Sequence, residues 1–400
     1  AERPLSSEDF SEESSEGDGE EGYIVNDPLG RRRIGGWGAG MDKRAVEATR
    51  QHYNRHAAPE RAQGEALAGR RGGRAYPLKQ FHNHVKRLLL RRFARGALLD
   101  LCCGRGGDLQ KWWDSGVRYV LGIDLAELEV EEARRRYERE REKRSRWGQP
   151  VMEAEFFPYA HLGEREMEWD RAFDVVSCQF AIHYFFVQER AVRTFLRNAS
   201  AALRPGGIFL ATFPDGKRVL AALQGRPSYQ SQMLSVRQRW EGPPQCFASP
   251  YQVSIADTVT EGEGGGSYEY LVFFNVLQAL AKEFGLEALT DYGADQELAA
   301  CFEPADRDKP FKHFCPPFKG GAGDARDRSL SQASELFCCV VFRKVAEPLE
   351  AGGGAGTPPP SGAAQEREEA QEPGEAGGAP PPPGEKAIRD AAPMKRAREG

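Results

Sequence analysis

The sequence predicts an α/β protein built on a doubly wound, mostly parallel sheet. Three observations support this fold class: short apolar runs alternate with helical segments, one run enters a glycine turn, and the next run ends in an acid. Continuous apolar runs bounded by turn residues are typical of buried parallel strands. The expected strands are Ala97–Leu101, Arg118–Ile123, Val151–Phe156, Phe173–Cys178 and Ile208–Thr212.

Helical patterns fill the spaces between and after these strands. Ala126–Arg146 is expected to be a long, highly charged helix. A second helix has one apolar face and is stopped by the segment Arg204-Pro205-Gly206-Gly207; that face carries Val192, Phe195, Leu196, Ala199 and Leu203. A helix near Asn275–Glu283 then precedes strands near Leu286–Asp291 and Leu336–Arg343, whereas residues 293–334 are polar and irregular.

Composition divides the 400 residues into one large domain and two tails. Residues 1–40 are acidic and then rich in glycine, and residues 347–400 contain proline runs and a basic end. We expect both tails to be disordered, because neither can bury enough apolar surface to offset its ordering entropy. Residues 41–346 are therefore expected to fold and to remain active as a fragment.

Charge and cysteine usage exclude several classes of protein. The net charge is −5, and residues 1–22 hold nine acids and one arginine, which leaves the remainder mildly basic. A basic body permits a polyanionic partner. No apolar run approaches the ~20 residues that span a membrane, and the acidic N-terminus lacks the apolar core of a signal peptide. The eight cysteines form no C-x-x-C pair, so we expect free thiols and no metal site.

The segment from Asp100 to Asp108 has the layout of a nucleoside-binding turn. Gly104 and its neighbours let the backbone approach a ligand closely, and Asp124 ends the next strand, where it can accept hydrogen bonds from both ribose hydroxyls. Leu109 stands where a dinucleotide-binding turn has its third glycine. S-adenosylmethionine, which has no pyrophosphate, is the commonest cofactor that fits. Without Asp124, an ordinary glycine turn of a parallel sheet would explain the segment almost as well.

Further segments resemble one family, the eukaryotic mRNA cap guanine-N7 methyltransferases. The resemblance follows the family's order from about residue 42 to residue 345. The glycine turn would suit many methyltransferases, whereas the segments around it are more specific. The matching segments are His52-Tyr53-Asn54, Phe81–Lys86, Asp100–Asp108, Ser177–Phe185 and Tyr268–Val272.

This resemblance implies a Rossmann-like class I methyltransferase that uses S-adenosylmethionine. It places the cofactor against Lys86, Asp100, Cys102, Gly104, Asp124, Gln179 and Tyr184. It places the cap guanine against His82, Asn83, His183, Glu269 and Phe337, with Tyr184 between the two ligands. It implies neither a metal nor an acid–base residue, and the transfer is expected to depend on positioning by Glu269, Tyr184 and His183.

The chain departs from the family pattern at several of these positions. His82 replaces an asparagine, Cys102 replaces a glycine, and Ala160 stands where the family has an acid at the adenine end. Phe337 stands where a cap-contacting tyrosine occurs, and His84 replaces a tryptophan. Two alternatives therefore stay open: a non-catalytic cap- or RNA-binding module, and a class I methyltransferase that acts on another substrate.

The expected chemistry needs no general base. Guanine N7 carries a lone pair and no proton at neutral pH, and a sulfonium methyl group is already activated. In-line displacement then depends on alignment of the two reactants. Glu269 has the sharpest expected role, because a carboxylate can accept hydrogen bonds from guanine N1–H and the exocyclic amine and also stabilise the cationic methylated base.

The expected partner is 5′-capped pre-mRNA, and the expected location is the nucleus. The basic segment Lys395-Arg396-Ala397-Arg398 resembles a nuclear import signal that importin alpha would bind. The resemblance further implies a small activating subunit and capping machinery associated with RNA polymerase II. Arginines between Arg134 and Arg146 could meet RNA phosphates, although we favour a solvated helix in which they pair with neighbouring glutamates.

Overall fold

The computed structural model describes residues 23–26, 32–35, 43–57, 73–261, 266–318, 324–345 and 388–390. Most of the two predicted disordered tails lies outside these residues. Within the tails the structure describes three short strands, and the expectation of disorder stays a prediction. Strands β1 (Tyr23–Asn26) and β2 (Arg32–Gly35) pair with each other, and β16 (Ile388–Asp390) pairs with β6 (Met167–Trp169).

The main sheet has the strand order β13-β15-β8-β7-β3-β4-β5. The neighbours from β8 to β5 are parallel, whereas β15 runs antiparallel to β8, β13 and β14. The predicted doubly wound, mostly parallel sheet is therefore confirmed. The bounds are β3 (Gly96–Leu101), β4 (Val117–Asp124), β5 (Glu153–Pro158), β7 (Phe173–Gln179), β8 (Leu203–Pro214), β13 (Leu286–Ala288), β14 (Phe311–His313) and β15 (Phe337–Lys344).

The direction of winding reverses between β3 and β7. The chain passes from β3 through β4 to β5 on one side, and then returns to β7 and β8 on the other side. Ligands of open α/β sheets bind at such a reversal, outside the carboxyl ends of the strands. Asp100, Asp124 and Gln179 lie near the carboxyl ends of β3, β4 and β7, so the topology brings them to one edge of the sheet.

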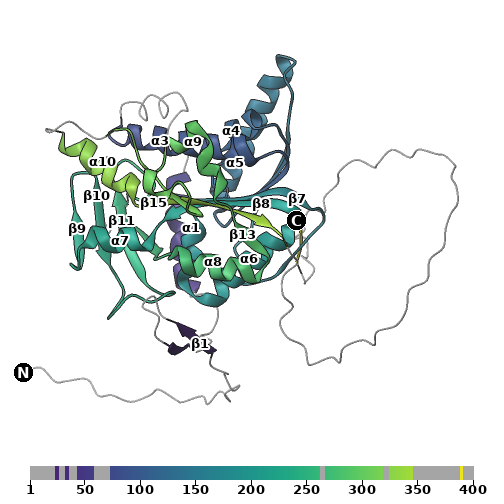
Figure 1. Ribbon diagram of the computed structural model, residues 1–400. Coiled ribbons are helices and arrows are strands. Elements are labelled where there is room, and N and C mark those ends of the chain that lie inside the picture. Colours follow the sequence, from purple (N-terminus) through teal and green to yellow (C-terminus); the bar gives the residue numbers. More distant parts are fainter. Residues whose placement is uncertain are drawn as a thin grey trace, which may run out of the picture.

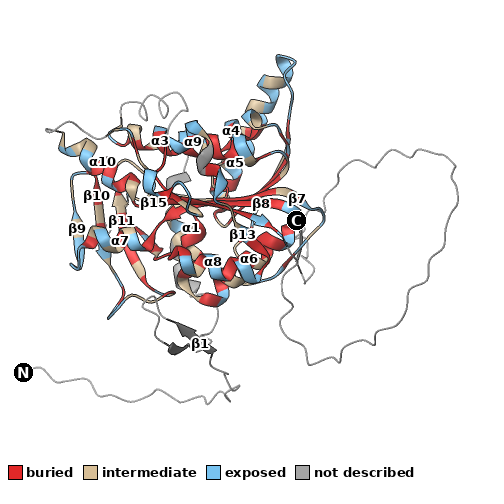
Figure 2. Cartoon of the chain, viewed as in Figure 1, coloured by how far each residue is buried: buried red, intermediate tan, exposed pale blue. Residues whose placement is uncertain are grey.

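Helices cover both faces of the main sheet (Figure 1). One face packs against α3 (Tyr76–Phe93), α4 (Leu109–Asp114) and α5 (Glu127–Arg146), and the other packs against α6 (Glu189–Ala202) and α8 (Phe274–Glu283). Figure 2 shows the sheet between these layers largely as buried residues. The helices predicted at 126–146 and 275–283 are confirmed. Short helical turns complete the set: η1 (Ile182–Val187), η2 (Asp291–Ala294), α9 (Gln296–Ala299) and η3 (Pro304–Asp306).

A second, four-stranded antiparallel sheet lies beside the main one and was not predicted. Its order is β12-β11-β10-β9, and its buried face packs against α7 and α10. Because α10 and β14 fall within residues 293–334, the expectation of an irregular segment there was wrong in part. The bounds are β9 (Ser228–Gln230), β10 (Leu234–Gln238), β11 (Pro250–Ile255), β12 (Ser267–Tyr270), α7 (Gly216–Leu223) and α10 (Ala325–Glu335).

Helix α1 (Lys43–Ala57) packs against α5 and against strand β12 of the small sheet. Arg50 and Asn54 of α1 hydrogen-bond to Glu127, the first residue of α5. All eight cysteines are free thiols, as predicted. In the described part of the chain, no helix is both long and apolar enough to cross a membrane.

Candidate active site

A cleft of about 900 Å³ opens at the edge of the sheet where the winding reverses. Pockets of this size accommodate cofactor-sized molecules. The cleft brings together every residue predicted for the cofactor, although these residues come from α3, three strands and η1. The lining includes Lys86, Asp100, Cys102, Gly104, Asp124, Gln179 and Tyr184, together with Asn83.

Asp124 is held by the backbone and faces the cleft. Its Oδ2 accepts a hydrogen bond from the Gly104 N–H at 2.8 Å, and its Oδ1 accepts one from the Ala126 N–H at 2.9 Å. Burial raises the pKa of this carboxyl group to about 6, and the two backbone N–H groups oppose that rise. Gly104 has φ +50°, a left-handed conformation that favours glycine. The turn and the acid are thus fixed to each other.

Asp100 is a buried carboxyl group whose hydrogen bonds are incomplete. Its Oδ1 has no hydrogen-bond partner among the described residues, and the side chain is 3% exposed. Burial raises the pKa of Asp100 well above its ordinary value, and the nearby Asp108 adds to the rise. A cationic ligand group would offset this cost. The α-ammonium group of S-adenosylmethionine has that chemistry, so the residues present fit this cofactor.

Charged pairs line the side of the cleft beneath α3. Asp108 lies 2.8 Å from the ammonium of Lys86 and 2.7 Å from that of Lys111. Burial alone would raise the pKa of Asp108, but the two ammonium groups outweigh it and lower that pKa. Arg105 and Glu129 form a second pair at 2.6 Å. The sequence did not predict these pairs, because nothing in the residue order shows that α3 and α4 converge.

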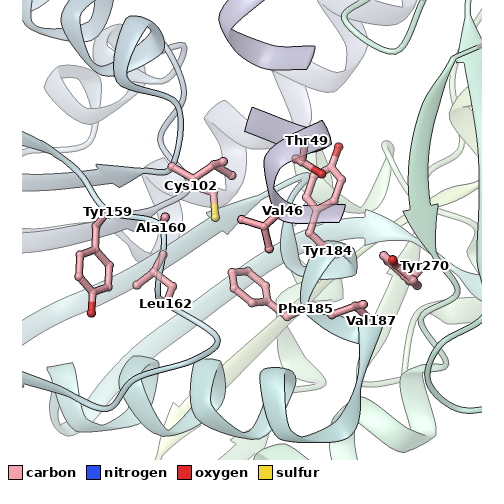
Figure 3. A pocket seen from close by; sticks show the side chains of 11 residues that line it. Val46, Thr49, Cys102, Tyr159, Ala160, Leu162, Tyr184, Phe185, Val187 and Tyr270 are labelled. Carbon is pink, nitrogen blue, oxygen red and sulfur yellow. The ribbon is translucent and has the colours of Figure 1, made fainter. Parts of the chain in front are cut away.

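Cys102 lies where the cleft meets a small apolar recess of about 60 Å³. Figure 3 shows its thiol pointing into the recess, with Ala160 and Leu162 on one side and Tyr184 on the other. Contact with the thiol of Cys178, together with burial, raises the pKa of Cys102 well above its ordinary value. Cys102 has φ +67°, which explains in physical terms why a glycine suits this position.

Glu269 is a buried member of a cluster beside the cleft, which we call the cap cluster: Glu269, Tyr251, His183, Tyr184 and Tyr53. Tyr251 is directly opposite Glu269 in the strand register, and its hydroxyl donates to Glu269 Oε2 at 2.7 Å. Glu269 is 4% exposed. Burial raises its pKa to about 7, and the tyrosine hydrogen bond opposes that rise. The carboxyl group is therefore poised between its two protonation states at neutral pH.

His183 does not neutralise this carboxylate. Its Nε2 is 3.7 Å from Glu269 Oε1, and neither ring nitrogen has a hydrogen-bond partner in the described part of the chain. Burial lowers the pKa of His183 to about 3, so the ring is uncharged at neutral pH. A buried imidazole without hydrogen-bond partners thus lies beside a buried carboxyl group, which is typical of a site that a polar ligand completes.

Tyr184 connects the cap cluster to the cleft. It lines both the cleft and the recess, and its hydroxyl lies 3.3 Å from that of Ser267, close to Glu269 on β12. The hydroxyl of Tyr53, on α1, lies 2.8 Å from that of Tyr184. The resemblance included the segment that contains Tyr53 but gave this residue no role, and its contact with a residue 131 positions away could not be read from the sequence.

Two of the remaining predicted residues, His82 and Phe337, lie against Phe180. His82 stacks on the Phe180 ring at 5.3 Å, bonds to the Ser334 hydroxyl, and lies 5.0 Å from the Phe337 ring. The linings of the described cavities include neither His82 nor Phe337, whereas Asn83 does line the cleft. Their roles as cap contacts stay predictions. Gln179 accepts a hydrogen bond from Thr212 at 3.0 Å, which orients its amide.

Comparison with known proteins identifies the family. A model of the mRNA (guanine-N(7))-methyltransferase domain matches residues 39–345. The mRNA cap guanine-N(7) methyltransferase 1 of Arabidopsis thaliana is 32% identical over 59% of this chain and 64% of its own length. The mRNA cap guanine-N(7) methyltransferase of Schizosaccharomyces pombe is also 32% identical, over 61% of this chain and 68% of its own.

The fold also resembles that of a solved S-adenosylmethionine-dependent methyltransferase from Clostridium acetobutylicum. That structure has a TM-score of 0.39 and 13% identity, and covers 66% of this chain and 91% of its own. The chain spans about two thirds of the length of the two curated relatives. Since the family model covers most of the described domain, the chain belongs to the mRNA (guanine-N(7))-methyltransferase family.

Proposed function

We propose that this chain transfers the methyl group of S-adenosylmethionine to N7 of the guanine in the 5′ GpppN cap of RNA. The family match supports this activity. The single observation that carries it in the structure is Glu269, a buried carboxyl group beside an uncharged histidine whose ring nitrogens have no partner among the described residues. Such a group suits a ligand that donates hydrogen bonds and becomes cationic.

Glu269 would select guanine and stabilise the product charge. Its carboxylate accepts hydrogen bonds from the N1–H and the exocyclic amine, and adenine has no N1–H to offer. Methylation at N7 makes the base cationic, so the attraction to the carboxylate grows as the reaction proceeds. An interaction that strengthens in this way lowers the barrier more than it strengthens ground-state binding.

The cofactor, when bound, supplies a methyl group that its sulfonium has already activated. The residues of the chain then only bind and align. Asp124 accepts hydrogen bonds from the ribose, Asp100 faces the ammonium, and Lys86 faces the carboxylate. Tyr184, which borders both the cleft and the cap cluster, holds the two ligands in line.

Access to Glu269 requires a local opening. Glu269 is 4% exposed, and the Tyr53 and Tyr184 hydroxyls lie in contact between it and the cleft. We therefore propose that Tyr53 moves aside with α1 when a capped substrate binds. Loops and terminal segments over active sites commonly close in this way.

Methyl transfer from labelled S-adenosylmethionine to GpppG-ended RNA tests the proposal, with uncapped RNA and free GTP as controls. The proposal predicts transfer to capped RNA and retention of the label at guanine N7. Cap binding without transfer would favour the non-catalytic binding module. Transfer to small molecules but not to capped RNA would favour a class I methyltransferase with another substrate.

We also propose that the chain acts in the nucleus on pre-mRNA. The basic segment at residues 395–398 supports import by importin alpha, and it lies outside the described residues. Replacing Lys395, Arg396 and Arg398 with alanine is expected to move a fluorescent fusion to the cytoplasm. A small activating subunit and the capping machinery of RNA polymerase II are further proposed partners, based on the family resemblance.

A further inference from the structure

The outer face of the small sheet carries polar and basic side chains. Alternate residues of β10 and β11 point into the core, among them Val236, Tyr251 and Val253. The strand register places the intervening residues in rows that cross the sheet on its other face. One row is Ser228, Arg237, Gln252 and Tyr268, and the next is Gln230, Ser235 and Ser254. We call this surface the outer sheet face; neither row contains an acid.

An exposed aromatic ring is held in place on this face. Tyr268 is 52% exposed, which is unusual for a large side chain on a strand of the domain. The guanidinium of Arg239 lies 5.8 Å from the centre of its ring and donates to Gln252 Oε1 at 2.6 Å. Arg237 is exposed in the same row and forms no ion pair among the described residues. An aromatic ring flanked by arginines and amides is suited to stacking with a nucleobase and contacting phosphates.

Helix α5 provides an instructive contrast. It has many more arginines than the outer sheet face, but they pair within the helix. Arg135 and Arg136 both contact Glu132, and other cations contact glutamates three or four residues away: Arg141, Lys143, Arg144 and Arg146. The structure thus agrees with the interpretation of α5 as a solvated, internally paired helix. Basic charge without a matching acid is found instead on the outer sheet face.

The outer sheet face adjoins the cap cluster. Tyr268 immediately precedes Glu269, and the two side chains point to opposite faces of β12. β12 is the edge strand of the small sheet, so the cap cluster and the outer sheet face lie on the two faces of one edge strand. If the cap binds at Glu269, the nucleotides that follow it would lie close to Tyr268 and Arg237.

We propose that the outer sheet face binds the single-stranded RNA that follows the cap. A base stacks on Tyr268, and phosphates contact Arg237 and Arg239. This inference rests on the proposed function, because it takes the cap guanine to lie against Glu269. It explains how the protein would distinguish the end of an RNA from a free cap dinucleotide.

Kinetics with two substrates test the inference: the GpppG dinucleotide, and a short unstructured RNA with the same cap. The wild-type protein is expected to have a higher kcat/KM for the RNA. Tyr268→Ala should lower kcat/KM for the RNA by about 5- to 150-fold, the range for losing one base–aromatic stack, and Tyr268→Phe should retain most of it. Arg237→Gln should reduce the dependence of log kcat/KM on log salt by roughly 0.7.

The dinucleotide separates this inference from the proposed function. Turnover of GpppG should be unchanged in all three variants, and their melting temperatures should match that of the wild type. Arg139→Gln, which removes an exposed arginine from α5, should leave both substrates unaffected. If wild type turns over GpppG but gains nothing from the RNA, or if Tyr268→Ala keeps the full gain, the outer sheet face does not bind RNA. If wild type methylates neither substrate, the proposed function itself fails.

Discussion

The cofactor cleft and the cap cluster differ in how their buried carboxylates are paired. In the cleft, Asp108 is paired with two lysines, and Asp124 accepts two backbone N–H groups. In the cap cluster, Glu269 accepts a hydrogen bond from the hydroxyl of Tyr251. Its other ionisable neighbour, His183, is uncharged at neutral pH. Within the cleft only Asp100 keeps an oxygen without a partner among the described residues, whereas the carboxylate of the cap cluster has no cation beside it until a ligand arrives.

This difference matches the different tasks of the two regions, which are to bind the cofactor and to stabilise the charge that develops on the guanine. A cofactor has to bind firmly in every cycle, and preformed pairs on rigid elements provide that. In the proposed reaction the cap guanine becomes cationic, so a buried carboxylate would interact with it more strongly in the transition state. The burial of the Glu269 carboxylate therefore costs stability in the free protein, and by the proposed mechanism it contributes where charge develops.

The largest effect is expected from a substitution in the cofactor cleft. Asp124→Ala removes the proposed acceptor for the ribose hydroxyls, and hydrogen bonds to charged groups contribute about 1.5–3 kcal/mol each. The affinity for S-adenosylhomocysteine, measured by calorimetry, should fall by roughly 10²–10³-fold. Binding of GpppG should change little, because Glu269 lies in the other cluster. Unchanged cofactor affinity would remove Asp124 from the ribose site.

The next effect is on stability: Glu269→Gln should stabilise the protein at high pH although it should lower the methyl transfer activity. The pKa of Glu269 is raised from 4.5 to about 7 in the folded chain, so the unfolded chain loses this proton first as pH rises. The free energy of unfolding therefore falls as pH rises from about 4.5 to about 7. Glu269→Gln has no carboxyl group to ionise and does not lose this stability. At about pH 8 the variant should be more stable by up to roughly 3 kcal/mol.

Denaturant unfolding of both proteins checks this stability prediction. The difference should shrink to under about 1 kcal/mol near pH 5, where most of the penalty is absent. A variant that is less stable than wild type at the higher pH would show that Glu269 is fully compensated in the folded protein. The contrast between the two halves of the site would then be lost.

The smallest effect is expected from a substitution of Cys102, which lies where the cleft meets the apolar recess. Cys102 has φ +67°, and a left-handed conformation costs an ordinary residue about 1–2 kcal/mol. Cys102→Gly should stabilise the protein by at most about 1 kcal/mol, since glycine also loses more entropy on folding. Cys102→Ala is the matched control: it removes the same sulfur but keeps the strained backbone, and should bring no such gain.

The same division shows what a sequence can and cannot predict. The cofactor half depends on contiguous signals, an apolar strand running into a glycine turn and a second strand ending in Asp124, so its location could be predicted. The cap cluster depends on pairing between elements. Tyr251 reaches Glu269 only because β11 and β12 are in a particular register, and their short strands carry weak periodicity.

The surroundings of His82 could not be predicted from the resemblance. The structure places His82 against Phe180 and Phe337 in an aromatic cluster, and its contact with the cap stays a prediction. A histidine can fill such a space as a neutral ring, since burial lowers the pKa of His82 to about 3. Which face of α3 meets the cleft is decided by packing, and residue order alone does not show it.

The most direct test of the central claim is the pH dependence of kcat/KM for GpppG at saturating S-adenosylmethionine. Saturation keeps the titration of Asp124 out of the measurement, and the range should end below the pH at which guanine N1 ionises. For the wild type, kcat/KM should rise about tenfold per pH unit up to about 7 and then level off, because only the Glu269 carboxylate accepts both guanine donors.

Glu269→Gln should give a flat profile that lies roughly 10²–10³-fold below the wild-type plateau, the scale of losing one preorganised electrostatic contact. Its affinity for S-adenosylhomocysteine should stay close to that of the wild type. A glutamine variant that keeps the wild-type pH dependence, or that turns over as fast, would contradict the account, because another group would then be reading the guanine.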